Sequence, residues 1–598
     1  MFQTFDAPTR PLDGPPRLAA LRAEMAAEGL DGFLVPRADA HQGEYVAPRD
    51  ERLAWLTGFT GSAGFAAILG DQAGVFADGR YKLQVRDQIA LVYAAVDWPQ
   101  TQLGPWLVAH APQNGVIGFD PWLHTAAEVE RLKTAVKNRG LTLRPCENLI
   151  DRIWSDQPAA PSGPIYDHPQ ELAGVGSAEK RAQIAEVLIK DGQDAVVLSL
   201  PDSIAWLLNI RGSDIARIPV VLAFAILDCK GRVKLFVDPT KTAGFKPDAD
   251  VKVFTPDEFQ GALAQLGGVV RVDPKTAPLA ISTALEAGGA SISHGDDPCL
   301  LPKACKNTAE LEGTVQAHLR DGAAMIEFLA WLDAEAPKGH LTEIEVVEKL
   351  EEFRRATNSL RDISFDTICG AGGHGAIVHY RVSRETDKAI APGQILLVDS
   401  GGQYVDGTTD ITRTVAVGGN PGAEERAAFT RVLQGMIAIS RLRWPHGLAG
   451  RDLDALARYP LWLAGQDYDH GTGHGVGTFL SVHEGPQRLS RLGEVPLEPG
   501  MILSNEPGYY SEGAFGIRIE NLIVVQEAPP LNGADDRRML TFRTLTWVPI
   551  DLSLVEVEFL SAGERDWLNA YHAQVFAIIA PRVSDSARDW LEAATRPL

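Results

Sequence analysis

Two acidic residues, Asp399 and Asp410, lie in a segment (residues 395–415) whose pattern brings their carboxylates together. Asp399 follows four apolar residues, which predict a buried strand, and a Gly-Gly turn then leads into a partner strand that carries Asp410. Such a hairpin directs both carboxylates to one point. Aspartate is usually a turn residue, and Asp406 before a glycine fits that role well. Asp399 does not, because a carboxylate at a buried strand end is costly unless something pairs with it.

Three histidines, His470, His474 and His483, follow within fourteen positions of one another. A single histidine is more often a core or surface residue than a ligand, and we interpret the isolated His446 in that way. Here glycines separate the clustered histidines and allow close approach of the backbone. The cluster therefore favours a functional site.

Glu506 and Glu520 complete the set of candidate groups. Glu506 follows a strand pattern over residues 501–505 and precedes Pro-Gly, so we expect it at a strand end that faces a turn. Glu520 is expected within one strand over residues 516–525, where alternation puts Arg518 and Glu520 on the same face. The alternative is a solvated polar face on which these two side chains form an ion pair.

These patterns gather four carboxylates and one imidazole at strand ends and strand faces. Four carboxylates in one pocket repel each other unless cations neutralise them, and two divalent ions bridged by carboxylates would do so. Oxygen ligands with a single nitrogen suit manganese or similar ions better than a thiolate zinc site does. Two ions about 3.5–4 Å apart hold a bridging hydroxide and polarise a carbonyl, which is a design for hydrolysis.

The first half of the chain, which precedes this set, contains an internal repeat. Residues 53–56 (Leu-Ala-Trp-Leu) match residues 204–207 (Ile-Ala-Trp-Leu), and the segment that starts at Phe76 matches the one at Phe236. A long repeat that occurs only twice fits a duplicated α/β domain better than a solenoid. A chance match is the alternative for segments as short as these.

Proline and helix-capping patterns predict where the domains begin and end. The proline-rich stretch over residues 157–164 is typical of a linker. Asn307 or Thr308 caps a predicted helix whose apolar positions recur to Leu332. We therefore expect three domains, over residues 1–157, 165–305 and 306–598.

Composition excludes several classes of function. The 598 residues include 56 Lys and Arg against 78 Asp and Glu, a net charge of −22. Nucleic acid and anionic membranes both favour a basic surface, so we expect neither as a partner. The five cysteines lack paired zinc spacing and are interpreted as free thiols of a reducing compartment. With no secretory signal pattern and no apolar run of roughly 20 residues, the chain is expected to be cytoplasmic.

The motifs resemble those of the pita-bread metallopeptidases, specifically the three-domain, cytosolic type of Xaa-Pro aminopeptidase (aminopeptidase P). The resemblance rests on VDSGGQYVDGTTDITRT, HGTGHGVGTFLSVHEGP, SNEPGYY and GIRIEN, and RGSDI and FADGRYKLQ are similar to landmarks of the family's N-terminal domains. It implies an α/β multidomain chain with two creatinase-like N-terminal α/β domains before a pita-bread (α+β) catalytic domain. It also implies that a hydroxide bridging two divalent ions hydrolyses N-terminal Xaa-Pro bonds of peptides. Manganese is the expected metal, with zinc or cobalt as alternatives.

The resemblance also implies roles for individual residues. The implied metal ligands are Asp399, Asp410, His474, Glu506 and Glu520, with Asp410 and Glu520 bridging the two ions. The implied catalytic groups are His379, His483 and Glu506, of which His483 stabilises the oxyanion and Glu506 moves the proton. His470 and Tyr510 are implied to lie near the substrate, and Arg518 to brace the bridging carboxylates.

Two other functions stay open. A prolidase uses the same ligands but cleaves only dipeptides, and about 305 residues before the catalytic domain favour the aminopeptidase. A pita-bread scaffold without catalysis is the second alternative, and the intact ligand set argues against it. The resemblance further implies a homodimer, with Trp462 in a segment associated with subunit contact. Simple core packing of this tryptophan is the alternative.

Overall fold

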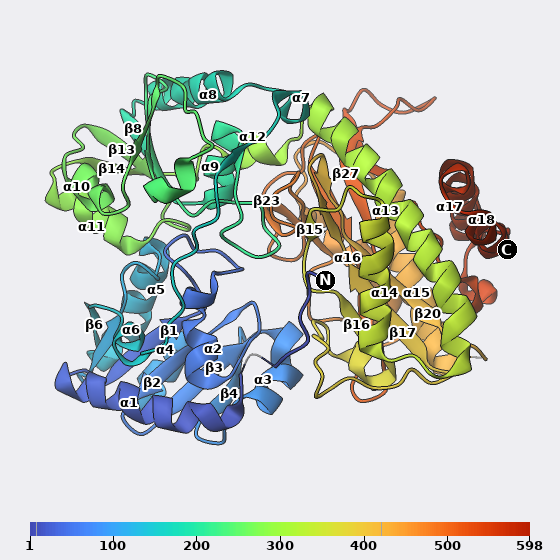
Figure 1. Cartoon of the computed structure of the whole chain (residues 1–598), viewed down its shortest axis with the longest axis horizontal. Coiled ribbons are helices and arrows are strands. Elements are labelled where there is room, and N and C mark those ends of the chain that lie inside the picture. Colours follow the sequence, from blue (N-terminus) through green and yellow to red (C-terminus); the bar gives the residue numbers. More distant parts are fainter. Residues whose placement is uncertain (8, 420) are drawn as a thin grey trace. The chain divides into compact units, whose positions relative to one another are not determined.

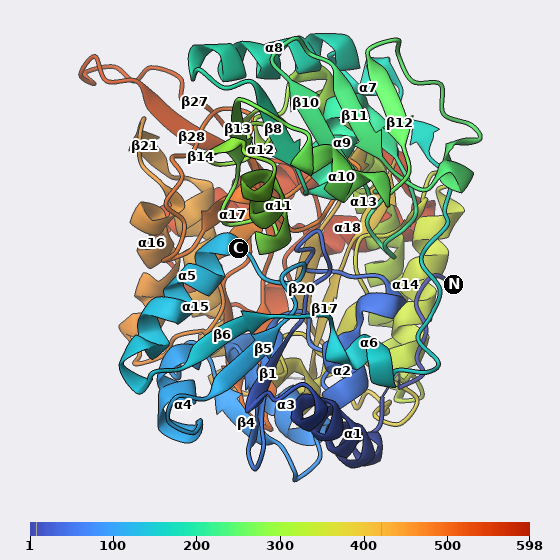
Figure 2. The same ribbon diagram turned by 90° about the vertical axis from the view of Figure 1, so that its left-hand side faces the viewer.

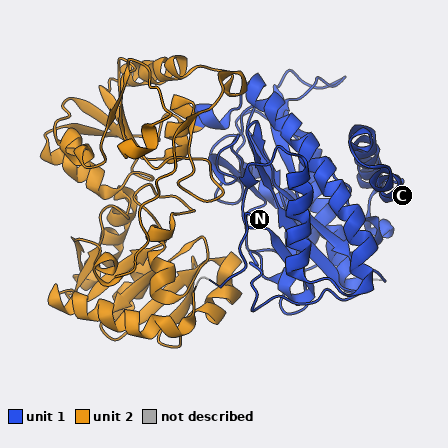
Figure 3. Cartoon of the chain, in the orientation of Figure 1, with its two compact units in different colours: residues 1–7, 301–598 blue, residues 8–300 orange. Residues whose placement is uncertain are grey.

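The computed structural model describes residues 1–7, 9–419 and 421–598. Contacts divide the chain into two compact units, shown in Figure 3: unit 1 contains residues 1–7 and 301–598, and unit 2 contains residues 8–300. The first residues belong to unit 1 because Phe5 is buried in its core. The side chain of Gln3 also exchanges two hydrogen bonds with the main chain of Thr367. The division into three domains stays a prediction.

Unit 2 contains two six-stranded mixed sheets of the same topology, with the orders β4-β3-β2-β1-β5-β6 and β12-β11-β10-β8-β13-β14. The strands of the first sheet are β1 (Gly32–Pro36), β2 (Gly64–Leu69), β3 (Ala73–Ala77), β4 (Ala94–Asp97), β5 (Val116–Phe119) and β6 (Thr142–Pro145). Those of the second are β8 (Ala195–Leu198), β10 (Phe224–Asp228), β11 (Val233–Phe236), β12 (Val251–Phe254), β13 (Val269–Val272) and β14 (Ser291–His294). The short strands β7 (Tyr166–Asp167) and β9 (Ile210–Arg211) pair separately.

Helices cover these sheets, and Figure 2 shows α8 against the second sheet. The helices of the first half are α1 (Gly14–Ala27), α2 (Arg52–Thr57), α3 (Lys82–Gln88), α4 (Leu103–His110), α5 (Ala126–Val136) and α6 (Leu149–Ile153). Those of the second half are α7 (Gln170–Ala173), α8 (Ser177–Lys190), α9 (Pro201–Leu208), α10 (Glu258–Ala264) and α11 (Leu279–Ala287). The matched residues 53–56 and 204–207 lie in α2 and α9, and Phe76 and Phe236 lie in β3 and β11. The equal sheet order confirms the predicted duplication.

Unit 1 is built from helices packed on short antiparallel sheets, and α13 and α14 lie side by side in Figure 1. Its helices are α12 (Leu300–Ala304, which begins at the unit boundary), α13 (Thr308–Glu335), α14 (Glu343–Ala356), α15 (Ala423–Ser440), α16 (Gly450–Trp462), α17 (Ala562–Ile579) and α18 (Asp585–Ala594). Of the two predicted caps of α13, Asn307 is the one observed, because its side chain accepts a hydrogen bond from the backbone of Glu310.

The sheets of unit 1 have the orders β16-β17-β20, β15-β18-β19, β25-β26 and β21-β28-β27-β24-β22-β23. The first strands are β15 (Asp362–Ile363), β16 (Ile368–Ala371), β17 (Ile395–Ser400), β18 (Gly402–Tyr404), β19 (Gly407–Thr408), β20 (Ile411–Ala416) and β21 (Arg443–Pro445). The remaining strands are β22 (Gly473–Gly475), β23 (Glu484–Leu489), β24 (Ile502–Asn505), β25 (Gly508–Ser511), β26 (Phe515–Arg518), β27 (Asn521–Glu527) and β28 (Met539–Thr544).

Two details of the predicted strands are wrong. The connection after Asp399 is not a simple Gly-Gly turn, because β18 and β19 form a small hairpin in another sheet before β20 begins. The expected single strand over residues 516–525 is two strands, since β26 pairs with β25 whereas β27 pairs with β24 and β28. The break falls at Ile519 and Glu520, where the chain passes between sheets. Among the described residues, no helix combines the length and apolar character needed to cross a bilayer.

Candidate metal centre

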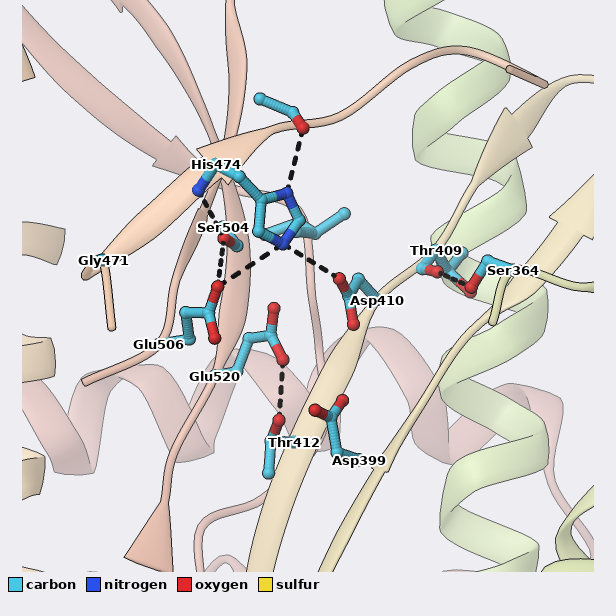
Figure 4. Close-up of polar contacts among 12 residues, drawn as sticks. Ser364, Asp399, Thr409, Asp410, Thr412, Gly471, His474, Ser504, Glu506 and Glu520 are labelled. Atoms are coloured by element: carbon cyan, nitrogen blue, oxygen red, sulfur yellow. Dashed lines mark hydrogen bonds and ion pairs between the residues drawn. The ribbon is translucent and has the colours of Figure 1, made fainter. Parts of the chain in front are cut away.

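Asp399 and Asp410 approach each other because their strands are neighbours in one sheet. Asp399 lies in β17 and pairs across the sheet with Thr412 of β20, while Asp410 directly precedes β20. All residues of β17 are buried, and Asp399 and Asp410 are 7% and 4% exposed. The predicted convergence of these two carboxylates on one region is visible in Figure 4.

The remaining three candidates come from the large sheet and its connections. His474 lies in β22, Glu506 directly follows β24, and Glu520 occupies the passage from β26 to β27. The Nε2 atom of His474 lies 3.5 Å from Asp410 Oδ2 and 3.4 Å from Glu506 Oε1 (Figure 4). Ligand atoms of Asp410, His474 and Glu520 all lie within 4.8 Å of one another. This spacing is small enough for one cation to contact all three.

The chemistry of the donors fits cations at this position. Within the described residues, Asp399 Oδ1, Asp410 Oδ1 and Glu520 Oε1 are buried and have no hydrogen-bond partner. Nδ1 of His474 lies 3.0 Å from the carbonyl of Gly475, which can only accept, so Nδ1 carries a proton. Nε2 is therefore the ring nitrogen that can ligate a cation, and it faces two carboxylates. Buried oxygens without partners, beside a histidine whose other nitrogen donates to a carbonyl, are the arrangement expected of metal ligands.

Burial and mutual repulsion raise the pKa values of three of these acids. Burial raises the pKa of Asp410 well above its usual range, and the charges of Asp399 and Glu506 raise it further. The pKa of Glu520 is raised by burial and by the charge of Asp410. Burial also raises the pKa of Glu506, which the charges of His474 and Arg518 partly offset. We name the four converging acids, Asp399, Asp410, Glu506 and Glu520, the carboxylate cluster.

Arg518 connects the carboxylate cluster to two of the residues expected near a substrate. Its Nη2 atom donates a 2.6 Å hydrogen bond to Asp399 Oδ2, and its Nη1 atom donates a 2.7 Å bond to the Tyr510 hydroxyl. That hydroxyl also lies 2.8 Å from Nε2 of His470. Arg518 and Glu520 are each 1% exposed, so the alternative of a solvated polar face is wrong.

The two histidines expected to be catalytic differ in what the structure shows. The ring of His483 lies 4.3 Å from that of His474, centroid to centroid, and so borders the cluster. His379 is half-buried after the short helical turn at residues 372–376. Its place in catalysis stays a prediction. His446 pairs with Glu527 at the surface, in agreement with its interpretation as an ordinary histidine.

Several residues that support the cluster were not anticipated. Thr412 donates a 2.7 Å hydrogen bond to Glu520 Oε2, and the Ser504 hydroxyl donates to Glu506 Oε1 and accepts from the backbone of His474. Alternation in the strand that follows Asp410 was a usable signal for Thr412, because residues 410 and 412 share a face. Ser504 carries no such signal.

Arg413 is a further support that the sequence did not reveal. Its buried guanidinium donates to the carbonyl of Glu520 and to oxygens of Asn521, Val548 and Tyr571. Arg413 therefore joins the cluster to the C-terminal region, including α17. Nothing in the local sequence predicts this contact, because the partners lie more than a hundred residues away.

Comparison with known proteins agrees with this geometry. Residues 312–527 match the model of metallopeptidase family M24, and residues 538–598 match the C-terminal region of the same family. Residues 17–153 and 156–310 each match a creatinase/prolidase N-terminal domain. Aminopeptidase P2 of Arabidopsis thaliana is 40% identical over 614 residues, which cover 95% of this chain and 86% of the relative. The chain belongs to metallopeptidase family M24.

Within the M24 family, the similarity to aminopeptidase P extends over nearly the whole chain. Aminopeptidase P1 of Lotus japonicus is 36% identical over 663 residues, covering 97% of this chain and 99% of the relative. The crystal structure of an X-prolyl aminopeptidase from Caenorhabditis elegans, described as a cytosolic enzyme with a di-nuclear active site, aligns with a TM-score of 0.93. It is 33% identical and the alignment covers 98% of this chain and 99% of that one. The resemblance to this family, and the fold that it implied, are confirmed.

Proposed function

We propose that this protein is an Xaa-Pro aminopeptidase whose carboxylate cluster, with His474, binds two divalent ions, manganese being the expected metal. The observation that supports the proposal most strongly is the set of buried oxygens without hydrogen-bond partners near Nε2 of His474. It occurs in a chain that aligns over 98% of its length with an X-prolyl aminopeptidase described as having a di-nuclear active site. When bound, the ions would activate a shared water as hydroxide and polarise the scissile carbonyl.

The chain's own residues would supply the remaining steps. Glu506, which Ser504 holds from one side, would accept a proton from the attacking water and deliver it to the proline nitrogen as the C–N bond breaks. His483, at the border of the cluster, would donate a hydrogen bond to the developing oxyanion, a contribution worth about 2.7–4 kcal/mol in comparable sites. His470 and Tyr510 would contact the substrate, since they reach the cluster through Arg518.

A cytosolic homodimer is part of the proposal. Trp462 is 41% exposed, which contradicts core packing, and it shares α16 with Leu456 and Tyr459, which are 40% and 58% exposed. These apolar side chains offer a surface for a second subunit. The cytosolic location is supported by the description of the Caenorhabditis elegans enzyme.

Product analysis with the Mn²⁺-loaded protein tests the activity. Three peptides are compared: Ala-Pro-Phe-Ala, the dipeptide Ala-Pro, and Ala-Ala-Phe-Ala. Release of alanine from the first, with little from the third, is the expected result. Cleavage of the dipeptide alone would instead identify a prolidase. Absence of cleavage with metal bound would favour a non-catalytic scaffold.

A further inference from the structure

A second group of buried charges lies in unit 1, outside the carboxylate cluster. Lys303 Nζ lies 3.0 Å from Glu484 Oε1, and Lys306 Nζ lies 2.5 Å from Glu484 Oε2. The side chains of Lys303 and Glu484 have no exposed surface, and that of Lys306 is 1% exposed. We name these three residues the lysine–glutamate cluster.

Stability alone does not account for this cluster. Taking three ionised side chains out of water costs several kcal/mol for each ion, and buried ion pairs are often replaced by apolar residues without loss of stability. The best-documented role of buried ion pairs is to specify a single arrangement of the chain. What Lys303 and Lys306 define is the position of Glu484, the first residue of β23.

Glu484 directly follows His483, the histidine that borders the metal centre. The lysines therefore hold the chain one residue away from the proposed oxyanion donor. The segment that carries the two lysines, residues 303–306, also contacts the chain at the start of β24, the strand that ends just before Glu506. The backbone N–H of Lys306 donates to the carbonyl of Gly500, and Cys305 forms a bridge with Met501, directly before β24.

We propose that Lys303 and Lys306 are positioning residues that act through Glu484 to hold His483 in its catalytic orientation. The inference rests on the proposed function, because it assigns His483 a part in that reaction. The segment of residues 303–306 contacts the starts of both β23 and β24. His483 directly precedes β23 and Glu506 directly follows β24, so this segment helps to fix their relative positions.

The test compares Lys303→Met with the unaltered protein, using Mn²⁺-loaded enzyme and Ala-Pro-Phe-Ala. Methionine keeps most of the side-chain volume and leaves Glu484 paired with Lys306. We expect kcat to fall by about 10- to 100-fold, the loss typical of residues that hold a functional side chain in place. KM and Mn²⁺ affinity should change little. Lys306→Met is the second variant, should the first fail to fold.

Lys241→Met is the matched control. Lys241 forms a buried 2.7 Å ion pair with Asp214 in unit 2, with side chains 5% and 0% exposed. We expect this variant to lose thermal stability and keep its kcat. If Lys303 acts through His483, Lys303→Met no longer lowers kcat in a His483→Ala background, because the imidazole whose orientation it maintains is absent.

Two results would overturn the inference. One is an unchanged kcat in Lys303→Met, and the other is an equal fold-decrease in kcat when His483 is present and when it is replaced by alanine. If the unaltered protein does not cleave the peptide, the proposed function fails, and crystal structures then decide the inference separately. His483 displaced in Lys303→Met supports the inference, and His483 in its original place contradicts it.

Discussion

Unit 1 contains two buried groups of charge that differ in how they are balanced. In the lysine–glutamate cluster, both carboxylate oxygens of Glu484 lie within 3.0 Å of an ammonium group. In the carboxylate cluster, Arg518 pairs with Asp399, yet oxygens of Asp399, Asp410 and Glu520 are buried without a hydrogen-bond partner among the described residues. Burial is similar in the two clusters, and the balance of charge distinguishes them, because two ammonium groups face the single carboxylate of Glu484.

The difference teaches how to separate a structural charge group from a binding site. A structural group has its counter-ions within the chain, whereas a site for cations leaves ligand atoms unsatisfied until the ions arrive. Burial, together with the charges of the neighbouring acids, raises the pKa values of Asp410 and Glu520 well above the usual range. The comparison therefore predicts that metal ions stabilise one cluster and leave the other unaffected.

The largest effect is expected from Asp410→Asn. The amide cannot offer two anionic oxygens to bridging ions. We therefore expect kcat/KM to fall by more than about 100-fold, which is the largest loss usual when a residue that only supports a metal ligand is replaced. Mn²⁺ stoichiometry, measured by isothermal titration calorimetry, should fall below two per chain. Asp406→Asn is the control, because Asp406 pairs with Arg320 outside the cluster. Full activity in Asp410→Asn would contradict the ligand assignment.

A smaller effect is expected from Arg518→Lys. Lysine keeps the positive charge but cannot contact Asp399 and Tyr510 together, as the guanidinium of Arg518 does. We expect Mn²⁺ affinity to weaken by about 10- to 100-fold, as measured by calorimetry. Lys303→Met should leave the same affinity unchanged. Equal weakening in both variants would remove the distinction between the two clusters.

The effect of Mn²⁺ on thermal stability should depend on pH. Since the folded pKa values of Asp410, Glu506 and Glu520 are raised, the metal-free folded state holds protons that the unfolded state releases, and its stability falls as pH rises above about 4. Mn²⁺ must displace these protons. The rise in Tm caused by Mn²⁺ should therefore grow between pH 5 and pH 8, and grow less in Asp410→Asn. A rise in Tm that does not depend on pH would contradict the raised pKa values of these acids.

The smallest effect is expected from Tyr571→Phe. The hydroxyl of Tyr571 accepts from Arg413, which donates to the carbonyl of Glu520, so its loss loosens one support of the carboxylate cluster. We expect a stability loss of about 1 kcal/mol, seen as a lower Tm, and a weakening of Mn²⁺ binding of less than about tenfold. Tyr459→Phe on the exposed face of α16 should leave Mn²⁺ affinity unchanged. Unaltered Tm and affinity in Tyr571→Phe would show that the C-terminal region does not support the site.

Prediction from sequence was most successful where a single segment contains both a helix or strand and the residue that matters for the site or the cap. The four apolar residues before Asp399 and the cap at Asn307 identified β17 and α13, since strand and helix signals are local. The assignment of His474 rather than His470 as the ligand needed the family resemblance, because spacing alone treats the clustered histidines alike. The geometry places His474 beside Asp410 and His470 beside Tyr510.

Contacts between distant segments could not be predicted. Lys306 meets Glu484 across 178 positions, and a lysine in a polar stretch is ordinarily a surface residue. The break between β26 and β27 was missed because residues 516–525 alternate like one strand, and only the pairing partners show that they belong to two sheets. Local patterns identify elements, whereas sheet partners and buried charges depend on the assembled fold.

The most direct test of the central claim is a crystal structure of the Mn²⁺-loaded protein with an anomalous difference map at the manganese absorption edge. We predict two peaks about 3.5–4 Å apart, in contact with Asp410 and Glu520, and none at the lysine–glutamate cluster. A single peak, or peaks away from the carboxylate cluster, would contradict the assignment of a dinuclear centre.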